Sequence, residues 1–436
     1  MNHQTMEQPT EQQLRDPYKT SRILYIIEAA LEYFIAILVG DTYLAKIAMT
    51  IGINDAGIGI LTAFVSLGHA FQIFAIFLSQ KKSVKKRTVW FGLVNQLLFS
   101  FIYVVPLFPS DFILGVPLFV GALLLAQIVM NVINPGKINW YMSLVPDKER
   151  GIFTANKEIV SLISGMIVSF AMGSLIDHYE AKGDLKTAFM LVGITMLILT
   201  ILHTLTLIFS KEKPKEQAEF ETKNADILRA LFKNKSLYRI IGVSVIWSIV
   251  TSSTNPFYGT YRLGTLGFSL TFVAILSAAY SVMRALFSRA MGRFADKHSF
   301  KKLLLLCYVI YGFAYLCAML SVPSNGKVMF TLFNVLSAVA MAGINSSEIN
   351  LIYDYVEPIQ RTGALAIKYM LSGVVGFLTT CLMSIPIDYI AKNGNKLFGI
   401  SMYPQQFTSF LGVVGVVLLF LYVKFVVRDK EKTEEK

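Results

Sequence analysis

The sequence predicts an all-α, polytopic membrane protein with twelve transmembrane helices in two pseudo-symmetric six-helix bundles. Three observations support this fold class. Of the 436 residues, 54% are hydrophobic and 16% are charged, and the mean hydropathy is +0.56. Apolar stretches of about 20 residues, the length that crosses a bilayer as a helix, alternate with short charged joints. The first half of the chain also repeats in the second half.

The apolar stretches place the spans in order. A water-soluble helix of this length carries a polar stripe, whereas segments such as 193–208 and 410–426 carry almost none. Because lipid offers no hydrogen-bond partner to the backbone, each span is expected to be helical. The spans are expected near 23–45, 56–79, 88–107, 112–134, 157–177, 187–209, 238–258, 267–290, 303–321, 327–350, 363–387 and 404–426.

Charge sets the expected orientation. The joint after the second span reads Lys81-Lys82-Ser83-Val84-Lys85-Lys86-Arg87, whereas the joint at 105–112 has no lysine or arginine. The positive-inside rule then predicts a multi-pass protein of the cell membrane with both termini in the cytoplasm. The expected parts are an N-terminal tail (1–22), an N-terminal bundle (23–209), a cytoplasmic linker (210–237), a C-terminal bundle (238–426) and a C-terminal tail (427–436).

The internal repeat has a constant offset. Adding 211 to the residue number relates 133–165 to 344–376 with ten identities over 33 positions and no gap, and an offset of 216 relates 81–86 to 297–302. Two copies of six spans share one membrane orientation. Parallel repeats of this kind are a transporter architecture, with the substrate site between the halves near mid-membrane.

The joint between the eighth and ninth spans carries a motif, Gly292-Arg293-Phe294-Ala295-Asp296-Lys297-His298-Ser299-Phe300-Lys301-Lys302. It resembles the loop signature of the major facilitator superfamily, with Ser299 in place of the usual second glycine. In the first-half copy, Gln80 stands where the acid belongs. With the twelve spans, the repeat and the long central loop, the resemblance covers nearly the whole chain. It implies the fold of that superfamily and a secondary transporter that moves a small solute by alternating access.

The resemblance also implies a cytoplasmic gate, in which Asp296 approaches the start of the fifth span when that side closes. The offset of 211 places Glu348 at the position of Lys137, so we expect these two to form an ion pair across the halves in the closed form. Either residue is alternatively a ligand for a charged substrate, and the basic joints alternatively serve topology alone. The expected gate residues are Asn134, Lys137, Arg150, Lys157, Asp296, Lys297, Asn345, Glu348, Arg361 and Lys368.

Two carboxylates lie inside the first span. Glu28 and Glu32 are four residues apart and therefore share one helical face. At about 1.5 Å per residue, Glu32 lies about 13–14 Å from Ile23, near mid-membrane. A charge at that depth costs about 2.5–3.5 kcal/mol or more, so Glu32 is a candidate for proton coupling or substrate binding. Alternatively, buried polar partners hold both carboxylates in a packing role, and Glu28 snorkels or serves the gate.

Other polar side chains complete this candidate set. Arg284 is expected either to bind an anion or to reach the cytoplasmic interface. Asn255 precedes Pro256, which disfavours helix there and predicts either a broken helix or a simple kink. The proton-coupling or substrate residues are Glu28, Glu32, His69, Gln72, Asn255, Tyr280 and Arg284.

Several functional classes are excluded. There is no GxxxxGK[ST] motif, so transport energy is expected from a proton or other ion gradient. The three cysteines lie in apolar stretches, and no metal cluster, cofactor motif or catalytic set is visible, so no enzyme is expected. The net charge of +12 lies in the joints, which argues against nucleic acid. The expected partners are a small-molecule substrate, the ion gradient and the lipid bilayer, with the chain as a monomer.

Two rival functions stay open. The first is a proton-coupled multidrug efflux antiporter, but the fifth span lacks the Gly-Pro pair and the fourth span lacks the embedded arginine common in such proteins. The second is a non-transporting receptor or scramblase on the same scaffold. The substrate and the direction of transport are not readable from these residues.

Overall fold

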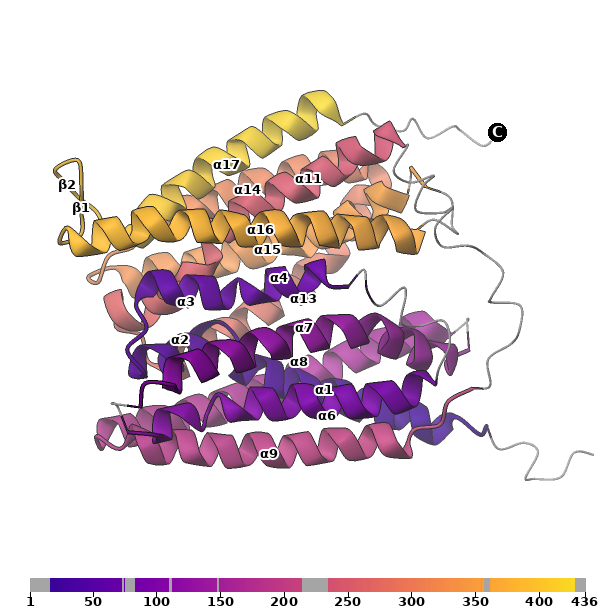
Figure 1. Ribbon diagram of the computed structural model, residues 1–436. Coiled ribbons are helices and arrows are strands. Elements are labelled where there is room, and N and C mark those ends of the chain that lie inside the picture. Colours follow the sequence, from indigo (N-terminus) through magenta and orange to yellow (C-terminus); the bar gives the residue numbers. More distant parts are fainter. Residues whose placement is uncertain are drawn as a thin grey trace, which may run out of the picture.

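The computed structural model describes residues 16–72, 74, 83–109, 112–146, 149–213, 234–353, 355–356 and 361–427. Almost all of the described chain is helical (Figure 1). The elements of the first half are α1 (Lys19–Leu38), α2 (Asp41–Thr50), α3 (Asp55–Thr62), α4 (Phe64–Ala70), α6 (Val84–Phe101), η1 (Val105–Leu107), α7 (Gly115–Ser143), α8 (Arg150–Ala181) and α9 (Leu185–Phe209).

The second half follows the same order of spans and adds one small hairpin. Its elements are α11 (Lys235–Ser252), η4 (Asn255–Phe257), α12 (Tyr258–Thr260), η5 (Tyr261–Thr265), α13 (Leu270–Lys297), α14 (Phe300–Met319), α15 (Gly326–Tyr353), α16 (Arg361–Lys392), β1 (Lys396–Leu397), β2 (Ile400–Ser401) and α17 (Pro404–Val426). The two strands pair antiparallel between α16 and α17.

The helices agree with the predicted multi-pass fold. Among the described residues, ten helices are long and apolar enough to cross a membrane. Helices α1 and α2 together make an eleventh span, bent by 43°. The shorter apolar segment Asp55–Ala70 corresponds to the second predicted span. The rest of that span, toward 79, lies mostly outside the described residues.

Local backbone chemistry explains two breaks in the spans. Helix α11 ends at Ser252, and the chain continues through one turn of 3-10 helix at Pro256 and a π-helical turn to Thr265. The regular α-helix is thus interrupted beside Pro256, which cannot donate a backbone hydrogen bond, while Leu237–Thr265 remains one span. The bend between α1 and α2 follows Gly40, and Asp41 has a positive φ of 41°.

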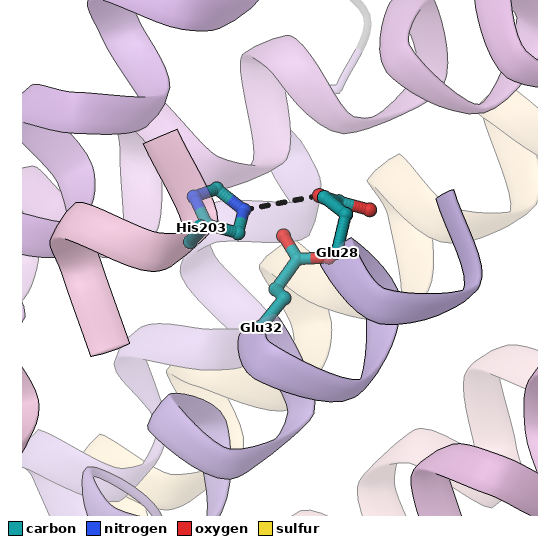
Figure 2. Close-up of side chains that lie close together, drawn as sticks. All are labelled: Glu28, Glu32 and His203. Carbon is teal, nitrogen blue, oxygen red and sulfur yellow. Dashed lines mark hydrogen bonds and ion pairs between the residues drawn. The ribbon is translucent and has the colours of Figure 1, made fainter. Parts of the chain in front are cut away.

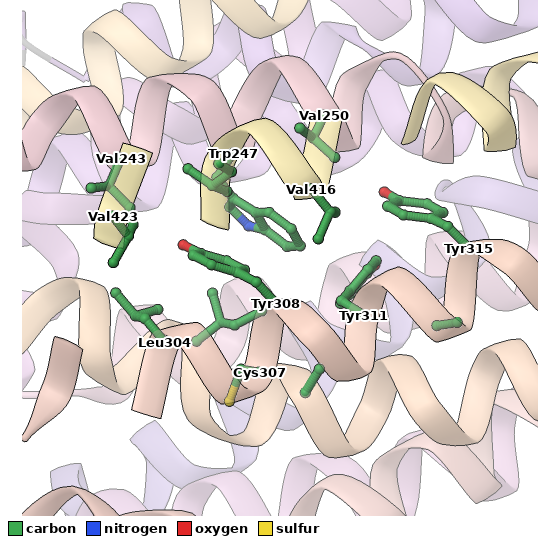
Figure 3. Packing of buried hydrophobic residues seen from close by; sticks show 14 of the residues in the cluster. Val243, Trp247, Val250, Leu304, Cys307, Tyr308, Tyr311, Tyr315, Val416 and Val423 are labelled. Atoms are coloured by element: carbon green, nitrogen blue, oxygen red, sulfur yellow. The ribbon is translucent and has the colours of Figure 1, made fainter. Parts of the chain in front are cut away.

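Each half has its own apolar core. One cluster of buried side chains belongs to the second half, and another lies almost entirely in the first half. Figure 3 shows the second-half cluster, where Trp247 of α11 packs against Tyr308 and Tyr311 of α14. The Trp247 and Tyr311 rings meet edge to face with centroids 4.9 Å apart. Large apolar side chains such as Ile201 and Phe209 are 60% and 68% exposed, as expected for surfaces that face lipid.

We call the helix ends beside the lysine-rich joints the basic end, and the other ends the opposite end. Helix α13 shows that the halves pack unequally at the two ends. Its residues Leu270, Val273 and Ala274, near the opposite end, are buried between the halves, whereas residues 284–290, toward the basic end, are all exposed. Seven consecutive exposed residues cover every face of a helix. On this side of the molecule the halves therefore separate toward the basic end.

Candidate functional site

A buried charge cluster lies inside the first half. Lys137 of α7 places its Nζ 2.8 Å from Glu28 Oε1 and 2.5 Å from Glu32 Oε2, both on α1. The side chains of Lys137 and Glu28 are 3% and 0% exposed, and that of Glu32 is 20% exposed. The spacing of four residues puts both carboxylates on the helical face that meets α7. Glu32 is thus the member of the cluster that reaches solvent.

His203 of α9 completes the cluster. Its Nε2 lies 3.0 Å from Glu28 Oε1, and its side chain is 2% exposed. Figure 2 shows the imidazole ring directed at Glu28, with Glu32 one turn further along α1. The second oxygen of Glu28 and Nδ1 of His203 are buried without a hydrogen-bond partner. The sequence analysis missed His203, although an imidazole inside the apolar run 187–209 is the kind of residue that demands a reason in a membrane.

The balance of charge in this cluster is negative. Two ionised carboxylates face one ammonium group, so one negative charge is left over unless a proton neutralises it. Glu28, Glu32 and His203 offer ligand atoms within 4.8 Å of one another, a grouping that also suits a metal ion. The Lys137 ammonium already contacts both carboxylates and repels a second cation. A metal ion in this grouping would therefore compete with Lys137 for both carboxylates.

The second half carries a related contact at the equivalent place. Glu348 of α15 accepts a hydrogen bond from Ser244 of α11 at 2.9 Å and lies 2.8 Å from Lys368 Nζ of α16. The offset of 211 relates Lys137 to Glu348, and the offset of 216 relates Glu28 to Ser244. The contacts of α7 with α1 and of α15 with α11 thus join equivalent positions. In the second half, charge is balanced by one lysine and one glutamate.

The gate residues are not brought together in this conformation. Within the described residues, Lys137 and Glu348 each pair inside their own half. Lys157 lies over the Tyr25 ring at 5.1 Å, while Lys297 and Asn345 are exposed and Asn134 is half-buried. The side chains of Arg150, Asp296 and Arg361 lie outside the described part of the chain. The cross-half pair was expected for a form closed at the basic end, so it stays a prediction.

The remaining predicted site residues are spread over both halves. Gln72 donates a hydrogen bond to Asn131 at 2.9 Å within the first half. The His69 ring faces the Tyr369 ring of α16 with centroids 6.1 Å apart, so this contact crosses the halves. Arg284 and Asn255 are exposed, and Tyr280 is half-buried one turn from Arg284. These positions are compatible with roles in solute binding, but no contact joins them to the charge cluster among the described residues.

The opposite end is closed by polar contacts between the halves, which the sequence did not predict. Arg262 of η5 donates to Asp41 at 2.5 Å, Asn54 donates to Asp388 at 3.2 Å, and Gln405 donates to Asp55 at 3.1 Å. Phe257 also lies so close to Gly59 that a Cβ at position 59 would be 1.9 Å from its ring. Only glycine fits there while this end stays closed.

Asp177, near the end of α8, accepts three hydrogen bonds from the other half. Its carboxylate accepts hydrogen bonds from the backbone N–H groups of Leu270 at 3.0 Å and Thr271 at 2.8 Å, and from the Thr271 hydroxyl at 2.5 Å. These groups form the N-terminus of α13, whose unpaired N–H groups and positive dipole end attract an anion. One carboxylate of the first half therefore caps a helix of the second half.

A cavity of about 280 Å³ lies next to this contact, between α1, α2, α8 and α13. Hydroxyl groups of Tyr33, Ser169, Ser277 and Ser281 are found among small apolar residues in its lining. It spans the boundary between the halves. Two related helical bundles, each with buried charges of its own and with a cavity on the boundary between them, define a secondary membrane transporter.

Comparisons with known proteins agree with this class. The family model of the Major Facilitator Superfamily matches residues 23–273 and 251–436. The chain belongs to the major facilitator superfamily, as the resemblance of the joint at 292–302 implied. It is a multi-pass membrane transporter and not an enzyme. No curated protein sequence matches the chain.

Solved structures share the fold at low sequence identity. A mutant of the nucleoside transporter NupG is 15% identical with a TM-score of 0.72, and the match covers 93% of this chain and 99% of that one. A D-xylose-proton symporter is 13% identical with a TM-score of 0.71, covering 95% and 99%. A mutant of the E. coli fucose:proton symporter FucP is 14% identical with a TM-score of 0.56, covering 94% and 99%. At these identities the likeness concerns the fold alone.

Proposed function

We propose that this protein couples the movement of a small polar solute to a proton gradient, with Glu32 as the group that takes up and releases the proton. The observation that carries the proposal is the surplus carboxylate beside Lys137. A lone negative charge in a membrane interior is costly, so one carboxylate gains from protonation. Glu32 is 20% exposed whereas Glu28 is fully buried, so Glu32 is the one that exchanges protons with water.

Alternating access is the proposed mechanism. The closed opposite end and the separation of α13 from the first half toward the basic end support a form that is open to one side only. The basic joints put that open side in the cytoplasm, with both termini there and the chain in the cell membrane. The other form requires the Asp177, Asp41 and Asp55 contacts to break and the gate at the basic end to form.

The solute class is proposed from the neighbours in fold. Two of the similar structures are described as a nucleoside transporter and a D-xylose-proton symporter. Nucleosides and monosaccharides are uncharged and rich in hydroxyl groups, and the hydroxyl-lined cavity between the halves suits them. These two solute classes therefore come first in a ligand screen, with amino acids, organic acids and dyes as the comparison set.

The test begins with thermal stability of the purified protein across these solutes, because a bound ligand raises the unfolding temperature. The stabilising solute is then assayed in proteoliposomes. We expect wild-type protein to accumulate it when a pH gradient is imposed, and Glu32→Gln to lose accumulation while keeping solute exchange without a gradient. Glu158→Gln, at an exposed position of α8, is the matched control.

Each alternative outcome decides against the proposal. Full accumulation by Glu32→Gln excludes Glu32 as the coupling group. Stabilisation by dyes alone, with dye efflux, favours the multidrug antiporter. Absence of flux for every stabilising solute favours a receptor or scramblase.

A further inference from the structure

His203 is a buried polar group that the proton-coupling proposal leaves without a role. It comes from α9, a helix that carries no other ionisable residue between Leu185 and Phe209 apart from Lys186 at its start. The one hydrogen-bond partner of its imidazole among the described residues is Glu28 Oε1, at 3.0 Å. Apolar helices rarely bury an imidazole without a function or a fixed partner.

The hydrogen-bond geometry assigns the tautomer of His203. An ionised carboxylate only accepts hydrogen bonds, so Nε2 must carry a proton that it donates to Glu28. A charged imidazolium would carry a second N–H at Nδ1, and that atom is buried without an acceptor. A buried charged N–H without a partner is costly. The neutral form with the proton on Nε2 is therefore the form that fits this site.

The charged and titratable surroundings support this assignment. From α1, Glu28, Glu32 and Tyr25 face the cluster, and from α7, Lys137 and Tyr141 do so. From α8, Lys157 Nζ lies 5.1 Å from the centroid of the Tyr25 ring. Within the part of the chain that the structure describes, Lys137 is thus the single permanent cation in direct contact, and His203 adds a neutral donor rather than a second charge.

Glu28 and Glu32 differ in the number of hydrogen-bond donors that they receive. Glu28 receives hydrogen bonds from both Lys137 and His203, whereas Glu32 receives one from Lys137. Donors directed at an ionised carboxylate stabilise its charged form. We propose that His203 is a positioning residue that holds Glu28 ionised through its Nε2–H, and thereby directs proton exchange to Glu32. This inference rests on the proposed function, because it explains why one carboxylate of the pair exchanges and the other does not.

The experiment reads carboxyl protonation directly and needs no substrate. Infrared difference spectra of the purified full-length protein in lipid are recorded during a pH titration, and the carbonyl stretch of protonated carboxyl groups is followed. Wild-type protein should show a band that Glu32→Gln removes. Glu32→Gln/His203→Leu should regain a band from Glu28, and adding Glu28→Gln should remove it again. When the titration of Glu32→Gln is extended to lower pH until Glu28 is protonated, its midpoint should lie about one pH unit below that of Glu32→Gln/His203→Leu, which lacks the donor.

Glutamine at position 203 separates the possible roles, because its amide donates a hydrogen bond but does not titrate. We expect Glu32→Gln/His203→Gln to behave like Glu32→Gln, with no regained band. In otherwise wild-type protein, His203→Gln should keep the midpoint of the Glu32 band. If His203→Leu does not yield folded protein, His203→Met supplies the donor-free variant.

The outcomes distinguish this inference from the proposed function. If Glu32→Gln removes no band, proton exchange at Glu32 is wrong whatever His203 does. If Glu32→Gln removes the band but the leucine and glutamine variants give identical spectra, the positioning role of His203 is wrong. If His203→Gln abolishes the pH dependence altogether, His203 carries the proton itself, and that result also overturns the inference.

Discussion

At the scale of single residues, Lys137 is the side chain on which two carboxylates depend. Glu28 has no exposure to water, and Lys137 is its one permanently charged partner among the described residues. Removing one member of a buried ion pair leaves its partner uncompensated, which costs about 3–5 kcal/mol in typical cases. Lys137 therefore stabilises the first half by balancing charge on these carboxylates.

We expect Lys137→Met to lower the free energy of unfolding by about 3–5 kcal/mol, because methionine fills similar space without the charge. Denaturant unfolding of the purified protein in detergent measures the change. Glu28→Gln/Lys137→Met should recover most of the loss, since the amide needs no counter-ion. A loss below about 1 kcal/mol in Lys137→Met, the range of an exposed pair, would contradict a buried cluster.

The same residues show how far sequence reasoning reached. The cost of buried charge singled out Glu28 and Glu32, and the repeat singled out Lys137. Neither gave their partners, because spacing along one helix says nothing about which face of another helix it meets. Lys137 was assigned to a gate across the halves, and in this conformation its partners lie in its own half.

At the scale of elements, α13 is held by a residue of another bundle. Asp177 supplies the cap that its N-terminus needs, and Ser269 supplies a second cap from the same chain segment by accepting from Phe272 N–H. A carboxylate stabilises a helix N-terminus through both hydrogen bonds and the helix dipole. The strength of this contact therefore sets part of the stability of the closed opposite end.

Asp177→Asn should weaken that closure, because the amide loses the negative charge and keeps one acceptor oxygen for three donors. A single cysteine at Ser277, in the cavity lining, should react with a polar maleimide several-fold faster in this variant. The background replaces Cys307, Cys317 and Cys381 with alanine.

The matched control is Asp184→Asn. Asp184 caps α9 inside the first half, where hydrogen bonds from Thr187 hold its pKa below the usual value. This variant should leave the labelling rate unchanged. Equal acceleration in both variants would mean that general loosening, and not the contact between halves, controls access.

The predicted helices match the structure where the local sequence determines the limits of a helix. The length of the apolar runs predicted the spans, and Pro256 predicted either a break or a kink after α11, where the regular α-helix is indeed interrupted. The bend between α1 and α2 was not predicted, because one apolar run covers 23–45 without a proline. The positive φ of Asp41 at that bend accompanies its ion pair with Arg262 of the other half, a contact that depends on tertiary structure.

At the scale of the whole molecule, the repeat predicted the two related bundles but not how they meet. Its offsets relate Lys137 to Glu348, yet each now has a partner within its own bundle. Lys137→Glu would place a third carboxylate beside Glu28 and Glu32, and Glu348→Lys would place a second ammonium group beside Lys368. Transport by the double variant would therefore depend on these contacts within each half as well as on the cross-half pair. A covalent link between the halves tests their relative movement directly.

A disulfide at the opposite end supplies that link. Asn54 and Asp388 lie on different halves, with their side chains 3.2 Å apart. In the background without native cysteines, Asn54→Cys/Asp388→Cys should cross-link under oxidation and stop solute uptake in proteoliposomes, because the opposite end must open in each cycle. Reduction of the disulfide should restore uptake, and the thermal stabilisation by solute should persist while the link is closed.

The control pair tests the cross-link itself. Ser100 of α6 and Thr200 of α9 both belong to the first half and have their hydroxyl oxygens 3.2 Å apart, so Ser100→Cys/Thr200→Cys should cross-link without stopping uptake. The two pairs share the chemistry and the background, and differ in whether the link joins the halves. Uptake that continues at the wild-type rate with the Asn54–Asp388 link fully formed would exclude rocking of the two bundles about this end. If only the Asn54–Asp388 link stops uptake, the halves must separate at the opposite end during transport. The contacts of Asp41, Asp55 and Asp177 must then break too, because they join the same two halves.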